Sequence, residues 1–336
     1  MIKVLIVDDS KSIRDILQKI IETSKDMKVV AKASNPYEAV KLLKKYNPDV
    51  ITLDIEMPGM SGIDFLKRLM NARPTPVVMI SSLTQKGADA TIKALDLGAI
   101  DFVPKRKLNN ELEKNRFIRE VNMKVRNASL VNVKKHKREN NKNINSEKKL
   151  AYNKKLILIG ASTGGVQSIK KMIQKFPSKT PPILIIQHMP KFFTKSFANS
   201  LNNAANIKVK EAENLEIVKK NTAYIAPGDY HMEVVKEKNK FKIKINQHKK
   251  VNRHRPSVDY TFHSIKKHDA SKTIGVLLTG MGDDGARGMK YLNNNGAITI
   301  AESQKTAVIF GMPQKAIQLN AVDHIVDLDK ISSVLF

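Results

Sequence analysis

The stretch LILIGASTGG, residues 156–165, decides the fold of the second half of this 336-residue chain. Its first four residues, Leu156–Ile159, are a short continuous apolar run, which predicts a strand buried on both faces, as in a parallel sheet. The small residues that follow predict a sharp turn, and a helical pattern follows over Ser168–Phe176. A strand, a glycine-rich turn and a helix in this order are typical of a doubly wound α/β domain.

The same alternation continues towards the C-terminus. Further buried strands are predicted at Ile183–Ile186, Thr222–Ala226, Thr273–Leu278 and Ala297–Ile300. Alternating apolar and polar residues predict a hairpin made of Met232–Val235 and Lys240–Ile245. We therefore expect residues 154–336 to form a mostly parallel, Rossmann-like domain with three α/β/α layers.

Residues 1–125 predict a separate flavodoxin-like domain, again α/β with a doubly wound parallel sheet. Its strands are expected at Val4–Val7, Val29–Ala31, Val50–Leu53, Pro76–Ile80 and Asp101–Val103. Its helices are expected at Ile13–Ile21, Tyr37–Tyr46, Ser61–Met70, Ala88–Leu97 and Leu108–Val125. Residues 126–153 are rich in Lys and Asn and have no periodic apolar residues, so we interpret them as an exposed basic linker between the two domains.

The composition excludes several classes of protein. Hydrophobic residues make up 41% of the chain, and no stretch approaches the ~20 apolar residues that span a bilayer. The start of the chain, Met1–Asp9, does not resemble a signal peptide. The chain has no cysteine, which excludes disulfides, thiolate catalysis and thiolate metal sites. We expect a cytoplasmic protein, monomeric by default, that does not insert directly into a membrane.

The formal net charge of +27 is densest in the middle of the chain, where residues 107–155 hold 15 basic and 5 acidic residues. A solvated linker is the interpretation we favour for such a run. Aromatic residues make up only 5% of the chain, so stacking on bases has little support, and we expect no nucleic-acid partner. Electrostatic steering towards an acidic protein partner is the remaining alternative.

Polar side chains follow four strands of the first predicted sheet. Asp8 and Asp9 follow the first strand, Asp54 the third, Ser81 the fourth and Lys105 the fifth. The carboxyl ends of parallel strands meet at one edge, where ligands bind. Converging carboxylates suit Mg²⁺, and one of them could accept a phosphoryl group that a hydroxyl and a lysine then bind. Solvated surface acids are the alternative, but each of these groups ends its own strand.

With these side chains at its strand ends, the segment 1–125 resembles the receiver domain of response regulators. The resemblance implies that Asp54 is the phosphoacceptor. It also implies that Asp8, Asp9 and Asp54 hold Mg²⁺ together with the main-chain carbonyl of Glu56.

The resemblance assigns three further roles. It implies that Ser81 is the switch hydroxyl, Phe102 the switch aromatic residue and Lys105 the phosphate partner. The chain departs from the family at Arg106, since most members have proline directly after the lysine, and the bend of this loop is then less fixed.

A second set of chemical residues follows the strands of the other domain. Gly160–Gly164 matches G-x-S-x-G, which places a serine on a sharp turn at the edge of a sheet. A phosphate-binding loop is the rival interpretation, but the Lys-Ser/Thr ending of a P-loop is missing. His188 ends the next strand and could serve Ser162 as a general base. A later strand ends in the glycine-rich loop Thr279–Gly285, whose carboxylates could orient the imidazole and whose N–H groups could bind an oxyanion.

The chain order Ser, His, Asp differs from that of the α/β-hydrolases. The motifs GASTGG, QHMP, RPSVD, TGMGDDG and FGMP, which start at residues 160, 187, 255, 279 and 310, together resemble the CheB family of chemotaxis protein-glutamate methylesterases. The resemblance implies Ser162 as nucleophile, His188 as base, Asp284 as orienting acid and the Met281 main chain as oxyanion donor. It implies no cofactor in this domain. Asp283 falls at a variable position of the motif, and the sequence leaves open whether it perturbs the partner of His188.

The resemblance implies that the protein demethylates glutamate methyl esters, and deamidates glutamines, on the cytoplasmic helices of methyl-accepting chemoreceptors. A histidine kinase would activate it through the receiver domain. A DNA-binding response regulator is the main alternative, but it requires a compact helix-turn-helix after the receiver, and the chain continues with an α/β pattern instead. A non-catalytic receptor scaffold is a third alternative, against which the complete Ser, His and Asp set argues.

Overall fold

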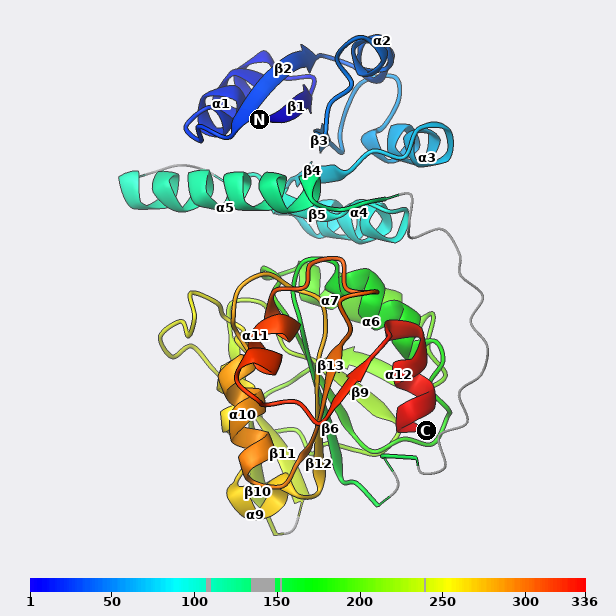
Figure 1. Cartoon of the computed structure of the whole chain (residues 1–336), viewed down its shortest axis with the longest axis vertical. Coiled ribbons are helices and arrows are strands. Elements are labelled where there is room, and N and C mark those ends of the chain that lie inside the picture. Colours follow the sequence, from blue (N-terminus) through cyan, green and yellow to red (C-terminus); the bar gives the residue numbers. More distant parts are fainter. Residues whose placement is uncertain (107–109, 134–148, 152, 239) are drawn as a thin grey trace. The chain divides into compact units, whose positions relative to one another are not determined.

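A computed structural model of the chain describes residues 1–106, 110–133, 149–151, 153–238 and 240–336 (Figure 1). Contacts within the chain divide it into two compact units, Met1–Asn140 and Asn141–Phe336, and each is described by itself. Most of the predicted linker, residues 134–148 and Tyr152, lies outside the described residues.

The first unit is a five-stranded parallel sheet with the strand order β2-β1-β3-β4-β5, as in flavodoxin-like folds. The strands are β1 Ile2–Val7, β2 Met27–Ala33, β3 Val50–Asp54, β4 Val77–Ser81 and β5 Asp101–Pro104. The helices are α1 Lys11–Ile21, α2 Pro36–Tyr46, α3 Gly62–Ala72, α4 Gln85–Asp96 and α5 Glu111–Ser129. Each helix begins after a Ser, Asn or Thr whose side chain accepts a hydrogen bond from a backbone N–H of the first turn, which stabilises the helix start.

Helix α5 has other bounds than the sequence predicted. The periodicity placed the helix over Leu108–Val125, but the described helix starts at Glu111 and continues to Ser129. Leu108 lies outside the described residues. The last turn is polar in sequence, yet Asn127 is buried, and Arg126 pairs with Asp26 at 2.7 Å. Ala128 is buried as well, but one small apolar side chain among polar residues is too weak a signal for the sequence to indicate that the helix continues.

The second unit is built on a seven-stranded sheet with the order β14-β13-β12-β6-β7-β9-β8, in which every pair is parallel. Its strands are β6 Leu156–Ala161, β7 Ile183–Gln187, β8 Lys208–Glu211, β9 Thr222–Ile225, β12 Thr273–Leu277, β13 Ile298–Glu302 and β14 His324–Val326. The predicted hairpin is present as the antiparallel pair β10 His231–Glu237 and β11 Lys240–Asn246. Two edge strands, β8 and β14, were not predicted because neither contains a continuous apolar run.

Helices of the second unit follow its strands. They are α6 Gly165–Ile173, α7 Phe193–Asn202, α8 Val258–His263, α9 Lys267–Ala270, α10 Ala286–Asn294, α11 Met312–Gln318 and α12 Leu328–Leu335. Helix α6 starts three residues earlier than the periodicity predicted, because Gly164 (φ 80°) turns the chain directly into the helix.

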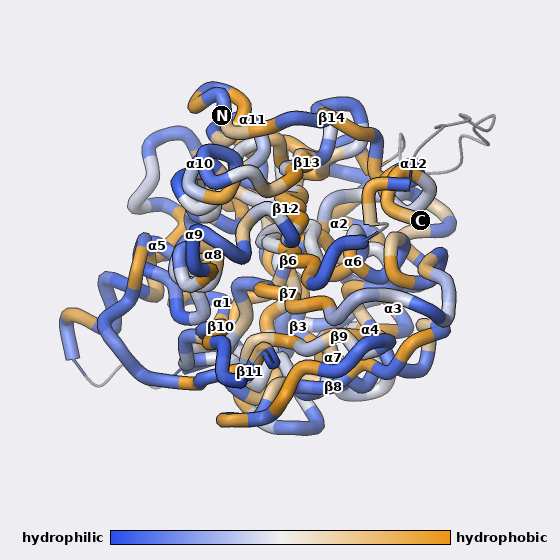
Figure 2. Tube along the Cα trace, turned by 90° about the horizontal axis from the view of Figure 1, so that it is seen from below, coloured by the Kyte–Doolittle hydropathy of each residue, from blue (hydrophilic) through white to orange (hydrophobic). Residues whose placement is uncertain are grey.

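The hydrophobic core of the second unit lies along its central strands. Figure 2 shows hydrophobic residues along β6, β7 and β12, and all residues of these three strands are buried. Because β6 lies between β12 and β7, the three chain segments that leave their carboxyl ends start side by side at one edge of the sheet. Among the described residues, no helix has the length and apolarity that crossing a bilayer requires.

Candidate functional site

Ser162 sits on a tight turn between β6 and α6, and its backbone is held from three sides. Its N–H donates to the carbonyl of Thr279 (3.0 Å), and its own carbonyl accepts from the N–H of Gly165 (2.8 Å) and from Nε2 of Gln187 (2.9 Å). The side chain of Ser162 remains partly exposed. The turn therefore presents Ser162 Oγ at the carboxyl edge of the sheet.

His188 reaches Ser162 because β6 and β7 are neighbours in register. Ala161 pairs with Gln187, and the next residue, His188, donates its N–H to the carbonyl of Ala161 (3.2 Å). Nδ1 of His188 lies 3.1 Å from Ser162 Oγ, and Nε2 lies 2.7 Å from Oδ2 of Asp284. The three side chains form one continuous line of hydrogen bonds.

The carboxylate of Asp284 is buried and accepts hydrogen bonds at both oxygens. Oδ2 accepts from the N–H of Val258 (2.7 Å) as well as from His188. Oδ1 accepts from Ser257 Oγ (2.7 Å), from Asn252 Nδ2 (2.7 Å) and from the N–H of Asp259 (3.2 Å). Two of these donors are backbone N–H groups at the start of α8, where the helix dipole favours a negative charge.

These contacts determine the protonation states of Asp284 and His188. Burial alone raises the pKa of Asp284, but the hydrogen bonds from His188, Asn252 and Ser257 hold that pKa well below its ordinary value. Asp284 is therefore ionised and accepts the Nε2 proton of His188. This assignment leaves Nδ1 of the neutral imidazole unprotonated and facing Ser162.

Two residues that the sequence did not single out complete the surroundings of the imidazole. Asn252 donates to both Asp284 and Asp259 (2.7 Å each), so it ties the two buried carboxyl groups together. The ring of His254 stacks on that of His188, with 3.7 Å between ring centroids and 4° between their planes. The nearby RPSVD motif was the available sequence signal, since Ser257, Val258 and Asp259 all contact Asp284.

The loop Thr279–Gly285 approaches Ser162 closely from the β12 side. A side chain at Gly280 would place its Cβ 2.8 Å from the Ser162 Cβ, so only glycine fits there. The N–H groups of Gly311 and Met312 in the FGMP motif both donate to the carbonyl of Gly280, which fixes the loop. Within the described residues, the Met281 N–H has no hydrogen-bond partner. Asp283 is exposed, and it is Asp284 that contacts His188.

Glu302 also contacts the loop Thr279–Gly285, and the sequence analysis did not single it out. It lies at the end of β13, is completely buried, and its Oε2 accepts from the N–H of Thr279 (2.8 Å). Burial raises the pKa of Glu302 to about 7. In sequence, a buried glutamate at the end of an apolar strand looks the same as an exposed one. The sequence therefore gave no sign that Glu302 is buried.

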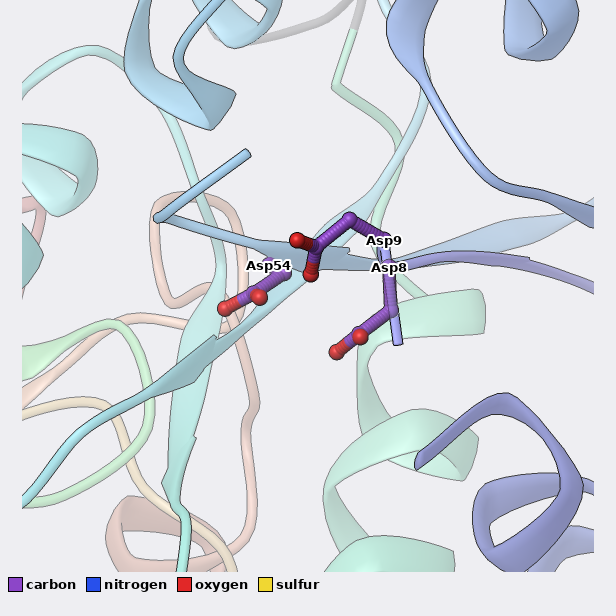
Figure 3. Close-up of side chains that lie close together, drawn as sticks. All are labelled: Asp8, Asp9 and Asp54. Carbon is purple, nitrogen blue, oxygen red and sulfur yellow. The ribbon is translucent and has the colours of Figure 1, made fainter. Parts of the chain in front are cut away.

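The three predicted carboxylates of the first unit gather at the edge of its sheet (Figure 3). One oxygen from each of Asp8, Asp9 and Asp54 lies within 4.8 Å of the others. Lys105 Nζ lies 2.8 Å from Asp54 Oδ2 and 3.3 Å from Asp8 Oδ2. Burial raises the pKa of Asp54 to about 6, and the charge of Asp8 acts in the same direction against the hydrogen bond from Lys105. Crowded carboxylate oxygens in a polar site are the donors that Mg²⁺ prefers, so the residues fit this ion.

The remaining predicted residues of the first unit lie on β4, on β5 and in the loop that follows β3. Ser81 is buried at the end of β4, where its hydroxyl donates to the carbonyl of Gly87 on α4 (3.1 Å). Phe102 is buried on β5. Glu56 and Asp9 line one open hollow of about 500 Å³. Arg106, which replaces the usual proline, pairs with Glu120 on α5 (3.0 Å).

Family comparisons agree with this division into two units. Residues 4–115 match the response regulator receiver domain, and residues 157–335 match the CheB methylesterase model. The second match covers more than half of the chain and includes Ser162, His188 and Asp284. The chain belongs to the CheB methylesterase family. Its CheB-type domain follows a receiver domain, as the sequence analysis expected.

Curated relatives and a solved structure extend the similarity to this CheB-family chain. Relatives from Salmonella typhi and Escherichia coli O157:H7, both named protein-glutamate methylesterase/protein-glutamine glutaminase, are 48% identical over 331 residues, which is 98% of this chain and 95% of each relative. The crystal structure of the Thermotoga maritima CheB methylesterase catalytic domain is 40% identical with a TM-score of 0.53, covering 54% of this chain and 97% of that one.

Glu302→Gln is predicted to change how the stability of this CheB-family chain depends on pH. A native carboxyl group with a pKa of about 7, above the ordinary 4.5, keeps its proton where the unfolded chain has lost it. Its stabilisation is full below pH 4.5 and is lost as the pH rises through 7, which amounts to about 2–3 kcal/mol between pH 5 and 8. Glutamine is uncharged at both pH values and avoids this loss. Relative to wild type, the free energy of unfolding of the variant should therefore increase by about 2–3 kcal/mol between pH 5 and pH 8. Urea unfolding at both pH values measures it. The exposed Glu237→Gln is the control, and an equal pH dependence in wild type and Glu302→Gln contradicts the prediction.

Proposed function

We propose that this protein hydrolyses the γ-methyl esters of glutamate side chains on chemoreceptor cytoplasmic helices, with Ser162, His188 and Asp284 as the catalytic residues. The observation that carries this proposal is the line of hydrogen bonds from Ser162 Oγ to His188 Nδ1 (3.1 Å) and from His188 Nε2 to Asp284 (2.7 Å). The names of the curated relatives support the choice of substrate. The protein would act in the cytoplasm, in the adaptation of bacterial chemotaxis.

The geometry supports a two-step acyl transfer. Ser162 Oγ attacks the ester carbonyl carbon while His188 Nδ1 takes its proton, and the Met281 N–H donates to the resulting oxyanion. Collapse of the tetrahedral intermediate breaks the bond to the methoxy group, which receives the proton from His188 and leaves as methanol. Water, deprotonated by His188, then attacks the acyl-enzyme. The bond to Ser162 Oγ breaks, His188 returns the proton to Oγ, and the glutamate side chain leaves as the acid, which ionises. Deamidation of a glutamine follows the same steps, with ammonia leaving in place of methanol.

The receiver domain supports control of this activity by phosphorylation. Asp54 would accept a phosphoryl group from a histidine kinase, and Lys105, already 2.8 Å from its carboxylate, would bind the phosphoryl oxygens. Mg²⁺ held by Asp8, Asp9 and Asp54, together with the Glu56 carbonyl, would neutralise charge during the transfer. Ser81 and Phe102 are the proposed switch residues. Activation would be a shift between two states of the protein that phosphorylation favours unequally.

Ser162→Ala is predicted to abolish methanol release from methyl-labelled receptor, and Asp284→Asn to lower kcat by about 10⁴-fold. The asparagine no longer holds the proton on Nε2 of His188, so Nδ1 loses its role as base. Asp283→Asn, next in the chain and exposed, should retain wild-type activity. If Asp283→Asn lost as much activity as Asp284→Asn, or if Ser162→Ala still released methanol, the assignment would be wrong.

Asp54→Ala is predicted to remove the response to a phosphodonor without removing the basal activity. Wild type should release methanol faster after addition of acetyl phosphate and Mg²⁺, whereas Asp54→Ala should release it at the same rate with and without them. Asp89→Ala, which removes another acid of the receiver on α4, is the matched control and should respond as wild type does. A phosphodonor response that persists in Asp54→Ala would contradict the proposed phosphorylation site.

A further inference from the structure

Phe192 combines an unfavourable backbone conformation with an exposed side chain. Its φ of 75° lies in the left-handed region, which glycine adopts freely and a bulky residue rarely adopts. The side chain is 44% exposed, so burial in the core does not offset this cost. Strained positions of this kind cluster at functional sites.

The fold fixes the backbone on both sides of Phe192. Before it, Gly228 presses against Pro190 so closely that a Cβ on Gly228 would lie 2.3 Å from the Pro190 carbonyl carbon. After it, Phe193 and Thr194 are completely buried. Thr194 Oγ1 donates to Glu211 (2.6 Å) and accepts from the Gly228 N–H (3.0 Å). These contacts hold the chain on both sides of position 192, where φ is positive, and glycine adopts a positive φ at the lowest cost.

The exposed ring belongs to a segment that leaves the sheet next to the nucleophile. Phe192 follows His188 by four residues, on the chain that leaves β7. Met281, on the loop that leaves β12, is also exposed, at 41%. Since β7 and β12 are the two neighbours of β6, one exposed apolar side chain comes from each segment flanking the turn of Ser162. Lys191 adds a charge, with Nζ 5.6 Å from the centre of the Phe192 ring.

We propose that Phe192, together with Met281 on the segment that leaves β12, is a specificity-determining contact for the polypeptide helix that carries the ester. An aromatic ring beside an ammonium group fits a helix that presents an aliphatic side chain and a carboxylate next to the modified residue. Phe192 and Met281 lie on the two segments that flank the turn of Ser162, so the occupant that we assign to them is the substrate. This inference rests on the proposed function and adds the determinant by which a polypeptide is preferred over a small ester.

The test compares two substrates in the full-length protein with acetyl phosphate and Mg²⁺ present. One is a methyl-labelled helical fragment of a chemoreceptor cytoplasmic domain, and the other is N-acetylglutamate γ-methyl ester α-amide. Phe192→Gly adopts a positive φ freely, and Phe192→Asn adopts it at a lower cost than a bulky residue does, so both variants should fold with a thermal midpoint at or above that of wild type. We expect each variant to raise KM for the receptor fragment about tenfold and to leave kcat/KM for the small ester unchanged.

Leu215→Gly is the matched control. Leu215 is also left-handed (φ 63°) and 62% exposed, but it follows the edge strand β8, three strands from β6. It should leave KM for both substrates unchanged. An unchanged KM for the receptor fragment in both Phe192 variants overturns the inference while the proposed function stands. An altered phosphodonor dependence with unchanged KM would also overturn it, because the ring would then act on the receiver domain. If wild type hydrolyses neither substrate, the proposed function fails and this inference fails with it.

Discussion

The buried carboxylate of Asp284 is the group on which the geometry of the catalytic domain depends. A buried charge is costly unless hydrogen bonds compensate it, and here Asn252, Ser257 and the start of α8 supply them. These hydrogen bonds fix the segment 252–259 against the loop that follows β12, and Asp284 orients the imidazole of His188 towards Ser162. The same contacts that stabilise the charge therefore set the direction of proton transfer.

Both domains place their chemistry according to one topological rule. In a parallel sheet every strand ends at the same edge, so residues far apart in sequence meet there. The receiver brings Asp8, Asp54 and Lys105 together from three strands, and the esterase brings Ser162 and His188 together from two. The first cluster is crowded with like charges and suits a cation, whereas the second combines one buried carboxylate with groups that move a proton.

Much of this arrangement could be predicted from the sequence because apolar runs mark the central strands and the chemical residues follow their ends. The exceptions have physical reasons. Edge strands β8 and β14 lack apolar runs, and the last turn of α5 packs through Asn127. Asn252 and His254 act through contacts with Asp284 and His188, which lie at least 32 residues away in the chain. Periodicity reports which face of an element is buried, and it says nothing about such contacts.

The most direct test of this account is the protonation state of the His188 ring. Long-range ¹H–¹⁵N spectra of histidine-labelled protein, with the signals assigned by their loss in His188→Gln, identify the nitrogen that carries the proton when the ring is neutral. The account predicts a proton on Nε2, facing Asp284, and a free lone pair on Nδ1, facing Ser162. A neutral ring protonated on Nδ1 would contradict it, because His188 could then not accept the proton of Ser162 in this geometry.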